Sequence, residues 1–234
     1  MQCEAHRSDD FRTRGLILEM KAQMVELDPL YTAVLEGKAN TARSIVEEAL
    51  AEGVDPNTLL TQYMIPAMDE VGRRYEANEY FVPELLISAR AMKAAMEVIR
   101  PALVAGGSSF SGKVVIGTVK GDLHDIGKNL VAAMLEGGGF EVVDLGVDVS
   151  PEKFVQAAQE NNAQIVAMSA LLTTTMPGMK ATVQAMKEAG LHGKVKVMIG
   201  GAPVTQAYAD EIGAHGFSDN ASGAVRVARS LTAA

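Results

Sequence analysis

Short apolar runs alternate with helical stretches through the second half of this chain, and this alternation limits its fold more than any other feature. The runs KVVIGTV, FEVVDLG, QIVAMSA and VKVMIGG are rich in β-branched residues, and each precedes a segment of helical spacing. Strands that alternate with helices form parallel sheets with right-handed crossovers. A weak fifth strand is expected near 216–217. Helices are expected over about 126–137, 151–161, 177–190, 203–212 and 221–232.

The first half of the chain has helical spacing throughout. One apolar helix is expected to stop at Gly37, and a second to begin with Asn40 as its cap and to end at Gly53. A third begins at Asp55, with a proline in its first turn. The segment FVPELLISARAMKAAMEVIRPAL carries one broad apolar face and forms a fourth. Four helices joined by short turns predict a small bundle.

These patterns divide the chain into four parts. Residues 1–24 are predicted to form a polar arm and residues 25–103 the helical bundle. Residues 104–112 are rich in Gly and Ser and form a linker, which is followed by the sheet domain over residues 113–234.

Composition excludes some partners and locations. The formal charge is −8 and no basic stripe is present, which argues against nucleic acid and anionic membranes as partners. No apolar run approaches the length that spans a bilayer, and the first residues lack the apolar core of a signal peptide. The lone cysteine, Cys3, cannot form an internal disulfide, which fits a reducing, cytoplasmic location.

The stretch GDLHDIGKN places titratable groups where the first strand ends and a helix begins. Ligands of open parallel sheets gather at the carboxyl ends of the strands. His124 in this loop could act as a base, as a metal ligand or as a structural hydrogen-bonding group. Asp122 could accept the hydrogen of one ring nitrogen and leave the other free for a metal. Gly121 and Gly127 leave the backbone open to a large planar ligand.

A metal at His124 would need ligands from elsewhere. Structural zinc takes about four protein ligands, and His6, His192 and His215 show no ligand spacing around this loop. A metal at His124 should therefore arrive with its other ligands attached, as it does in a macrocycle.

Three motifs in order carry a specific resemblance. Asp122-Leu-His124-Asp-Ile-Gly127 matches the D-x-H-x-x-G motif of cobalamin-binding proteins, and Ser169-Ala-Leu171 and Gly200-Gly201 match the later S-x-L and G-G motifs. The motifs are separated by 41 and 28 residues. The segment EVGRRYEANEYFVPELLISARAMKAAMEVI resembles the helical cap domain that precedes this fold in cobalamin-dependent methionine synthase and in the corrinoid proteins of methanogens and acetogens.

The resemblance covers roughly residues 25–234 and implies a fold. This fold is of class α + α/β: a four-helix bundle cap followed by a flavodoxin- or Rossmann-like domain with a five-stranded parallel sheet. His215 stands where the family pattern has an acidic residue, which makes the last strand the least certain part of the match.

The resemblance also implies roles for individual residues. His124 replaces the lower base of the corrinoid on cobalt, and Asp122 is its hydrogen-bonding partner. Tyr75, where methionine synthase has Phe, would cover the methyl-bearing face with Val82 and Leu85, for which ordinary bundle core is the alternative. The cofactor-binding residues implied are Gly121, Asp122, Leu123, His124, Asp125, Ile126, Gly127, Ser169, Leu171, Thr173, Gly200, Gly201, Ala221, Tyr75, Val82 and Leu85.

The function implied is that of a methyl carrier. Cobalamin or a related corrinoid, cycling between methylcob(III)alamin and cob(I)alamin, would take a methyl group from a substrate-specific methyltransferase. The donor could be a methylamine, methanol, a betaine or a methoxylated aromatic. A second methyltransferase would pass the group to coenzyme M or tetrahydrofolate, and a reductive activase would restore the reduced cobalt. Three alternatives remain: a cobalamin-dependent regulator, a mutase small subunit, and a flavodoxin-like signalling domain.

Overall fold

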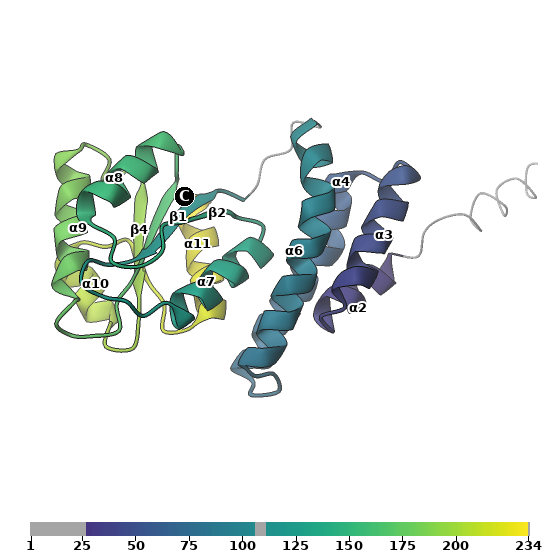
Figure 1. Ribbon diagram of the computed structural model, residues 1–234, viewed down its shortest axis with the longest axis horizontal. Coiled ribbons are helices and arrows are strands. Elements are labelled where there is room, and N and C mark those ends of the chain that lie inside the picture. The colour runs from purple at the N-terminus through teal and green to yellow at the C-terminus, as the bar shows by residue number, and fades with distance from the viewer. Residues whose placement is uncertain (1–26, 106–110, 234) are drawn as a thin grey trace, which may run out of the picture.

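A five-stranded sheet and a helical bundle lie side by side in the computed structural model (Figure 1), which describes residues 27–105 and 111–233. The predicted arm over 1–24 lies outside the described residues, as does most of the predicted linker. This arrangement confirms the predicted fold class.

The sheet consists entirely of parallel strands in the order β2-β1-β3-β4-β5. Its strands are β1 (Lys113–Thr118), β2 (Glu141–Asp144), β3 (Ile165–Ser169), β4 (Lys196–Gly200) and β5 (Gly216–Phe217). From β1 the next strand, β2, is added on one side, and β3 to β5 are then added in turn on the other side of β1. Such a switch point, here between β1 and β3, opens a crevice at the carboxyl ends of these strands. The short fifth strand is held in part by His215, whose Nδ1 accepts a hydrogen bond from the Val197 N–H at 3.0 Å.

Five helices cover the two faces of the sheet. They are α7 (Ile126–Gly137), α8 (Pro151–Glu160), α9 (Pro177–Glu188), α10 (Gln206–Ile212) and α11 (Ala221–Thr232). Helices α7 and α11 lie on the face toward the bundle, and α8, α9 and α10 lie on the other (Figure 1). Helix α10 begins three residues later than expected because the Thr205 side chain caps it, accepting a hydrogen bond from the Tyr208 N–H.

The bundle contains α2 (Asp28–Leu35), α3 (Ala39–Ala51), α4 (Pro56–Thr58), the π-helical turn η1 (Leu59–Met64), α5 (Ile65–Glu76) and α6 (Val82–Ala105). The cap predicted at Asp55 is confirmed, since its carboxylate accepts hydrogen bonds from the N–H groups of Asn57 and Thr58. The cap predicted at Asn40 is wrong: α3 already begins at Ala39, and no side chain caps it.

The run from α4 to α5 is one helical path that contains a wider π turn. Pro66, at the start of α5, has no N–H to donate to the preceding turn. The N–H of Ile65 instead donates to the carbonyl of Leu60, five residues earlier. The π turn thus allows the helix to continue past the proline.

The two halves are packed together along α5 and α6 of the bundle and α7 and α11 of the sheet domain. A side chain on Gly72 would meet Ser222 of α11, because a Cβ there would lie 2.5 Å from the serine Oγ. Gly137 of α7 gives similar room to Met68 of α5. Two ion pairs border the contact, Glu76 with Arg226 at 2.6 Å and Asp69 with Arg229 at 2.9 Å. Apolar side chains of the bundle and of one sheet face form a continuous core.

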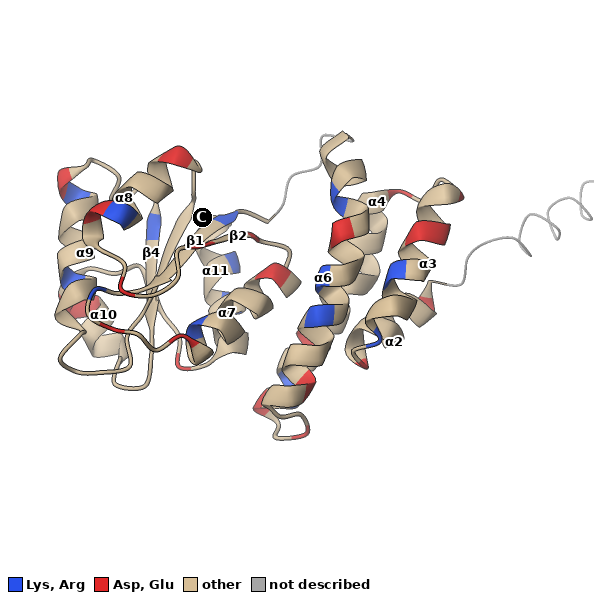
Figure 2. Cartoon of the chain, viewed as in Figure 1, with Lys and Arg blue, Asp and Glu red and all other residues tan. Residues whose placement is uncertain are grey.

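The charged residues of the described helices are of both signs, and Figure 2 shows them interspersed along the chain. Within the described ranges, no helix combines the length and the apolar character needed to cross a bilayer.

We predict that Gly72→Leu loosens the contact between the two halves, because the new side chain would overlap Ser222 at their interface. The expected result is faster proteolytic cleavage between the halves and an increased radius of gyration in X-ray scattering. Ala51→Leu, which adds the same side chain at an exposed position of α3, is the matched control. Equal cleavage rates in the two variants would contradict the prediction.

Candidate functional site

Asp122 is the buried centre of the loop that follows β1. Its side chain is fully buried and accepts four hydrogen bonds. One oxygen accepts from the backbone N–H of His124 at 3.0 Å and contacts Nδ1 of the same residue at 2.7 Å. The other accepts from the Leu171 N–H at 2.8 Å and from Oγ1 of Thr175 at 2.7 Å. A single carboxylate therefore joins the loop after β1 to the loop after β3.

These donors keep Asp122 ionised. Burial by itself would raise the pKa of the carboxyl group, but the hydrogen bonds from Thr175, His124 and Leu171 outweigh it and hold this pKa well below its ordinary value. A carboxylate has no hydrogen to donate, so the hydrogen in its contact with His124 must lie on Nδ1. The tautomer of neutral His124 is thereby determined, and the lone pair is on Nε2.

The His124 ring faces open space. Its side chain is 51% exposed and lines a cavity of about 550 Å³. Its backbone carbonyl is fixed from below, accepting a hydrogen bond from Oγ1 of Thr118 at 2.9 Å. Within the described parts of the chain, Nε2 has no hydrogen-bonding partner. The ring is therefore anchored on one side and available on the other.

The cavity exists in part because a small residue, Ala167, lies at the centre of the sheet face beneath α7 and α11. Ile116, Ala167 and Met198 lie side by side in register across β1, β3 and β4, and all three line the cavity. Ala167 leaves a notch between its larger neighbours. Ala221 and Ala224 of α11 leave further room above it. The result is a slot that runs from the His124 loop into the space between sheet and helices.

Glycines make one wall of this slot thin. Ser169, at the end of β3, is paired in register with Gly200, at the end of β4. Gly201 has φ of +135°, and a Cβ there would lie 1.9 Å from the carbonyl oxygen of Ala170. The chain after β4 can therefore lie directly against the segment after β3, whose Leu171 N–H holds Asp122.

The structure brings most of the expected site residues to this one cavity. Its lining includes Tyr75, Leu123, His124, Asp125, Ile126, Gly127, Ser169, Leu171, Gly200, Gly201 and Ala221. Asp122 lies behind His124. Gly121 does not line the cavity: its φ of +84° serves a turn, and its N–H donates to Asp148 at 2.8 Å. Thr173 is exposed to solvent and does not line the cavity. Leu85 does not line it either, because its side chain is fully buried in the core of the bundle.

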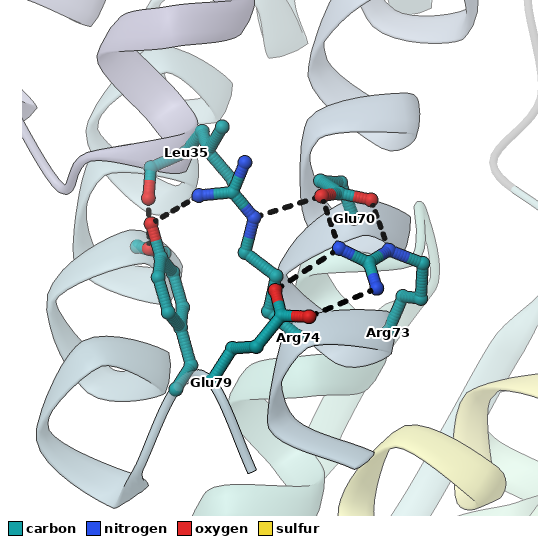
Figure 3. A network of polar contacts seen from close by, with 7 residues as sticks. Leu35, Glu70, Arg73, Arg74 and Glu79 are labelled. Carbon is teal, nitrogen blue, oxygen red and sulfur yellow. Dashed lines mark hydrogen bonds and ion pairs between the residues drawn. The ribbon is translucent and has the colours of Figure 1, made fainter. Parts of the chain in front are cut away.

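Tyr75 and Val82 come from the end of the bundle that reaches the cavity. They line a second, neighbouring cavity of about 620 Å³, and Tyr75 borders both. A charged network braces this end of the bundle (Figure 3). Glu70 accepts from Nε of Arg73 at 2.7 Å and from Nε of Arg74 at 2.8 Å, which lowers its pKa to about 2.

The same network extends into the turn between α5 and α6. Arg73 pairs with Glu79 at 3.2 Å, and Arg74 donates to the Tyr80 hydroxyl at 3.1 Å. Since Tyr75 follows Arg74 directly, the network connects the position of Tyr75 to the turn that leads to Val82.

Large apolar side chains line the cavity beside His124 without being buried. Leu123 is 72%, Ile126 is 82% and Leu171 is 43% exposed, and all three line the cavity with His124. Such a cluster of exposed apolar side chains is typical of a binding surface. The surface suits a broad, largely apolar ligand seated on the histidine.

Two family models described as a B12 binding domain match the chain, one over residues 112–226 and the other over residues 26–100. The dimethylamine corrinoid protein of Methanosarcina barkeri is 43% identical over 88% of this chain and 97% of that protein. Trimethylamine corrinoid protein 1 of Methanosarcina acetivorans is 44% identical over 85% of this chain and 93% of that protein. The chain belongs to the B12-binding corrinoid proteins.

Solved structures agree with this assignment. A cobalamin-binding protein from Desulfitobacterium hafniense aligns with a TM-score of 0.73 and 34% identity, over 89% of this chain and 99% of that one. The methanol:cobalamin methyltransferase complex of Methanosarcina barkeri aligns with a TM-score of 0.78 and 31% identity, over 88% of this chain and 79% of the matched chain. The predicted family and its corrinoid cofactor are thereby confirmed.

The residues around the cavity fit a corrinoid. Among the described residues, no group of three His, Cys, Asp or Glu side chains could hold a metal ion alone. A cobalt ion at Nε2 of His124 would therefore bring its equatorial ligands with it. A side chain at Gly127 would meet open space within 4 Å, so the helix start presents bare backbone beside the ring.

Sequence reasoning missed two residues of this corrinoid protein. Thr175 holds Asp122 from a position 53 residues away, whereas Thr173, two residues earlier in the same TTT run, was expected to act in the site. Lys128, in the GKN continuation of the motif, is only 2% exposed. The run of threonines was a usable signal, but spacing could not indicate which threonine faces Asp122.

We predict that Asp122→Asn destabilises the protein in a pH-dependent way. The pKa of Asp122 is low in the folded state and about 3.9 in the unfolded chain, so its ionised form stabilises the fold above about pH 4. This contribution is lost as the pH falls through the folded-state pKa. The unfolding free energy should drop by about 1–3 kcal/mol at pH 7, and the difference from wild type should narrow below pH 4.

Urea unfolding at pH 7, 5 and 3.5 measures this effect, with the exposed Asp210→Asn as control. A difference between Asp122→Asn and wild type that is constant over this range would contradict the assignment.

We predict that Gly201→Ala disrupts the slot wall. The new Cβ would overlap the Ala170 carbonyl, so the unfolding free energy should fall by more than about 2 kcal/mol. The control is Gly193→Ala, which also has positive φ (+98°) but open space around its Cβ, and should cost about 1 kcal/mol. Equal losses in the two variants would show that contact with Ala170 is unimportant.

Proposed function

We propose that this protein carries methyl groups in the cytoplasm between two partner enzymes. It would bind a corrinoid whose lower base has left the cobalt, with His124 as the axial ligand in its place. The observation that supports this most is the His124 ring, with Nδ1 held 2.7 Å from a buried carboxylate oxygen and Nε2 facing the cavity. When bound, the corrinoid supplies the cobalt ion that accepts and releases the methyl group.

Asp122 would control how strongly His124 binds the metal. A ligating histidine must present a neutral nitrogen, and a carboxylate on the opposite nitrogen increases its basicity. Asp122 is well suited to this role, because three further donors keep it ionised and fixed in position. Thr175 and the Leu171 N–H would therefore act on the metal through Asp122 and His124.

The slot would take the detached nucleotide tail. Ser169 offers a hydroxyl group at its mouth, and Gly200 and Gly201 keep the wall thin enough for an extended chain. Ala221 and Ala224 of α11 leave the depth free of bulky side chains. The inner end, lined by Ile116, Ala167 and Met198, would exclude water from the tail.

The end of the bundle would shield the upper face. Tyr75 borders both cavities, and Val82 borders the second, so both lie where they could cover a ligand bound at His124. Leu85 would contribute indirectly, by anchoring the start of α6 in the bundle core. Each partner must reach the cobalt, so the bundle must move aside. The Asp69–Arg229 and Glu76–Arg226 pairs lie at least partly in solvent, and such pairs oppose separation weakly.

We infer that the methyl donor is chosen by the partner enzyme. The dimethylamine and trimethylamine corrinoid proteins of Methanosarcina acetivorans are both 44% identical to this chain, so carriers serving different donors resemble it equally. The first partner would be a substrate-specific methyltransferase, for a methylamine or methanol. A second methyltransferase would deliver the group to coenzyme M or tetrahydrofolate, and a reductive activase would reactivate oxidised cobalt.

We predict that His124→Ala loses the spectrum of histidine-coordinated corrinoid and most methyl transfer, because no other described side chain replaces Nε2. Asp122→Asn should weaken both partially, with corrinoid affinity falling about 10- to 100-fold. The measurements are visible and EPR spectra of the reconstituted protein and methylation by purified methylamine and methanol methyltransferases. His192→Gln, at a histidine remote from the cavity, is the control.

Unchanged spectra and turnover in His124→Ala would refute the axial role. Normal corrinoid binding with no methylation by any donor enzyme would instead favour a cobalamin-dependent regulator.

A further inference from the structure

Lys128 is a buried ammonium group in the wall of the cavity that His124 lines. It lies in the first turn of α7, four residues after His124, with only 2% of its side chain exposed. Its Nζ donates to Oδ1 of Asn129 at 2.6 Å and pairs with Oδ2 of Asp144, at the end of β2. Burying an ammonium group is costly unless it is paired, and a surface position on α7 would have avoided that cost. The arrangement therefore calls for an explanation beyond packing.

The lysine determines which way the Asn129 amide faces. An ammonium group has only donors, so it can be met only by the amide oxygen, and the Nδ2 group must point the other way. There Nδ2 donates to Oδ2 of Asp125 at 3.1 Å. The backbone N–H of Asn129 also donates to the Asp125 carbonyl, at 2.7 Å. Asp125 is thus held twice by Asn129, and Asp125 is joined to His124 by a peptide bond.

Asp144 connects this relay to the sheet. Its second oxygen, Oδ1, accepts a hydrogen bond from the Gly146 N–H at 2.9 Å, in the loop after β2. β2 is paired in register with β1, from which the His124 loop emerges. The relay Asp144–Lys128–Asn129–Asp125 therefore joins the end of one strand to the loop of the next.

The His124 loop depends on such hydrogen bonds because packing does not hold it. Leu123 and Ile126, on either side of His124 and Asp125, are 72% and 82% exposed. On the inner side, Asp122 and Thr118 restrain His124. On the outer side, the restraint identified in the described structure is the pair of bonds from Asn129 to Asp125.

We propose that Lys128 is a positioning residue for His124. By orienting Asn129, it fixes Asp125 and so limits how far the His124 ring can move away from the cobalt it would bind. The proposal rests on the proposed axial role of His124, and it assigns to the loop a second restraint, independent of Asp122.

Three variants test the relay at different points. Asn129→Ala removes the side-chain bond to Asp125 at an exposed position, while the backbone bond and the Lys128–Asp144 pair are retained, so the variant is expected to fold. Lys128→Met keeps the length and removes the charge, and Asp144→Asn leaves the lysine without its anion. The matched control is Lys113→Met, which removes a lysine from the Lys113–Glu141 pair (3.2 Å) at the other end of the same two strands.

Two measurements report on His124 itself. In the corrinoid-free protein, exchange of the hydrogen-bonded amides at residues 124 and 129 should become at least about tenfold faster in Asn129→Ala, Lys128→Met and Asp144→Asn, and stay unchanged in the control. In the protein loaded with cobalamin, affinity should fall about 10- to 100-fold, with less of the histidine-coordinated EPR signal. Thermal unfolding separates these local effects from a general loss of stability.

The outcomes separate the two proposals. If His124→Ala loses the histidine-coordinated signal while Asn129→Ala and Lys128→Met behave like Lys113→Met in exchange and affinity, the relay is refuted and the axial role stands. If His124→Ala keeps that signal, the axial role fails and the positioning role fails with it. If Lys128→Met does not fold, Asn129→Ala decides, since it leaves the buried ion pair in place.

Discussion

The bond between the Asp122 carboxylate and Nδ1 of His124 is the interaction on which the rest of the site depends. It requires an ionised carboxylate in a fully buried position, which would be unfavourable without compensating donors. Those donors come from the loops after β1 and β3, so the carboxylate connects adjacent strands of the sheet as well as orienting the ring. The same carboxylate therefore orients the histidine and joins the two loops at the carboxyl edge of the sheet.

The order of the strands provides the space beside that bond. After β1 the chain enters α7 on one face of the sheet, and after the adjacent β3 it enters α9 on the other face. The cavity opens where these two paths diverge. Ala167 between Ile116 and Met198 deepens it, and Gly201 lets the next loop close against the Ala170 backbone. A site of this kind needs small residues on the sheet face as much as it needs a histidine at its rim.

The bundle meets the sheet domain through a shared apolar core, through side chains packed against glycines, and through half-exposed ion pairs. Contacts at Gly72 and Gly137 are shape-specific, whereas the Glu76–Arg226 and Asp69–Arg229 pairs contribute little energy. Such an interface has one well-defined closed arrangement, and opening it would expose part of the apolar core that the two halves share. The network around Glu70 links α5 to the turn before α6 (Figure 3), so Tyr75 would move with the bundle as a unit.

The sequence by itself determined the parallel sheet, the helical bundle and the position of His124 at a strand end, because these follow from local periodicity and from a motif of six neighbouring residues. The cap at Asp55 was equally local, whereas Asn40 lost that role because the helix began one residue before it. Only the tertiary structure decided that Thr175 reaches Asp122, that Leu85 faces the bundle core, and that Lys128 is buried against Asp144. Thr175 and Lys128 meet partners 53 and 16 residues away in the sequence, and such contacts depend on strand order, register and helix placement, which no local pattern specifies.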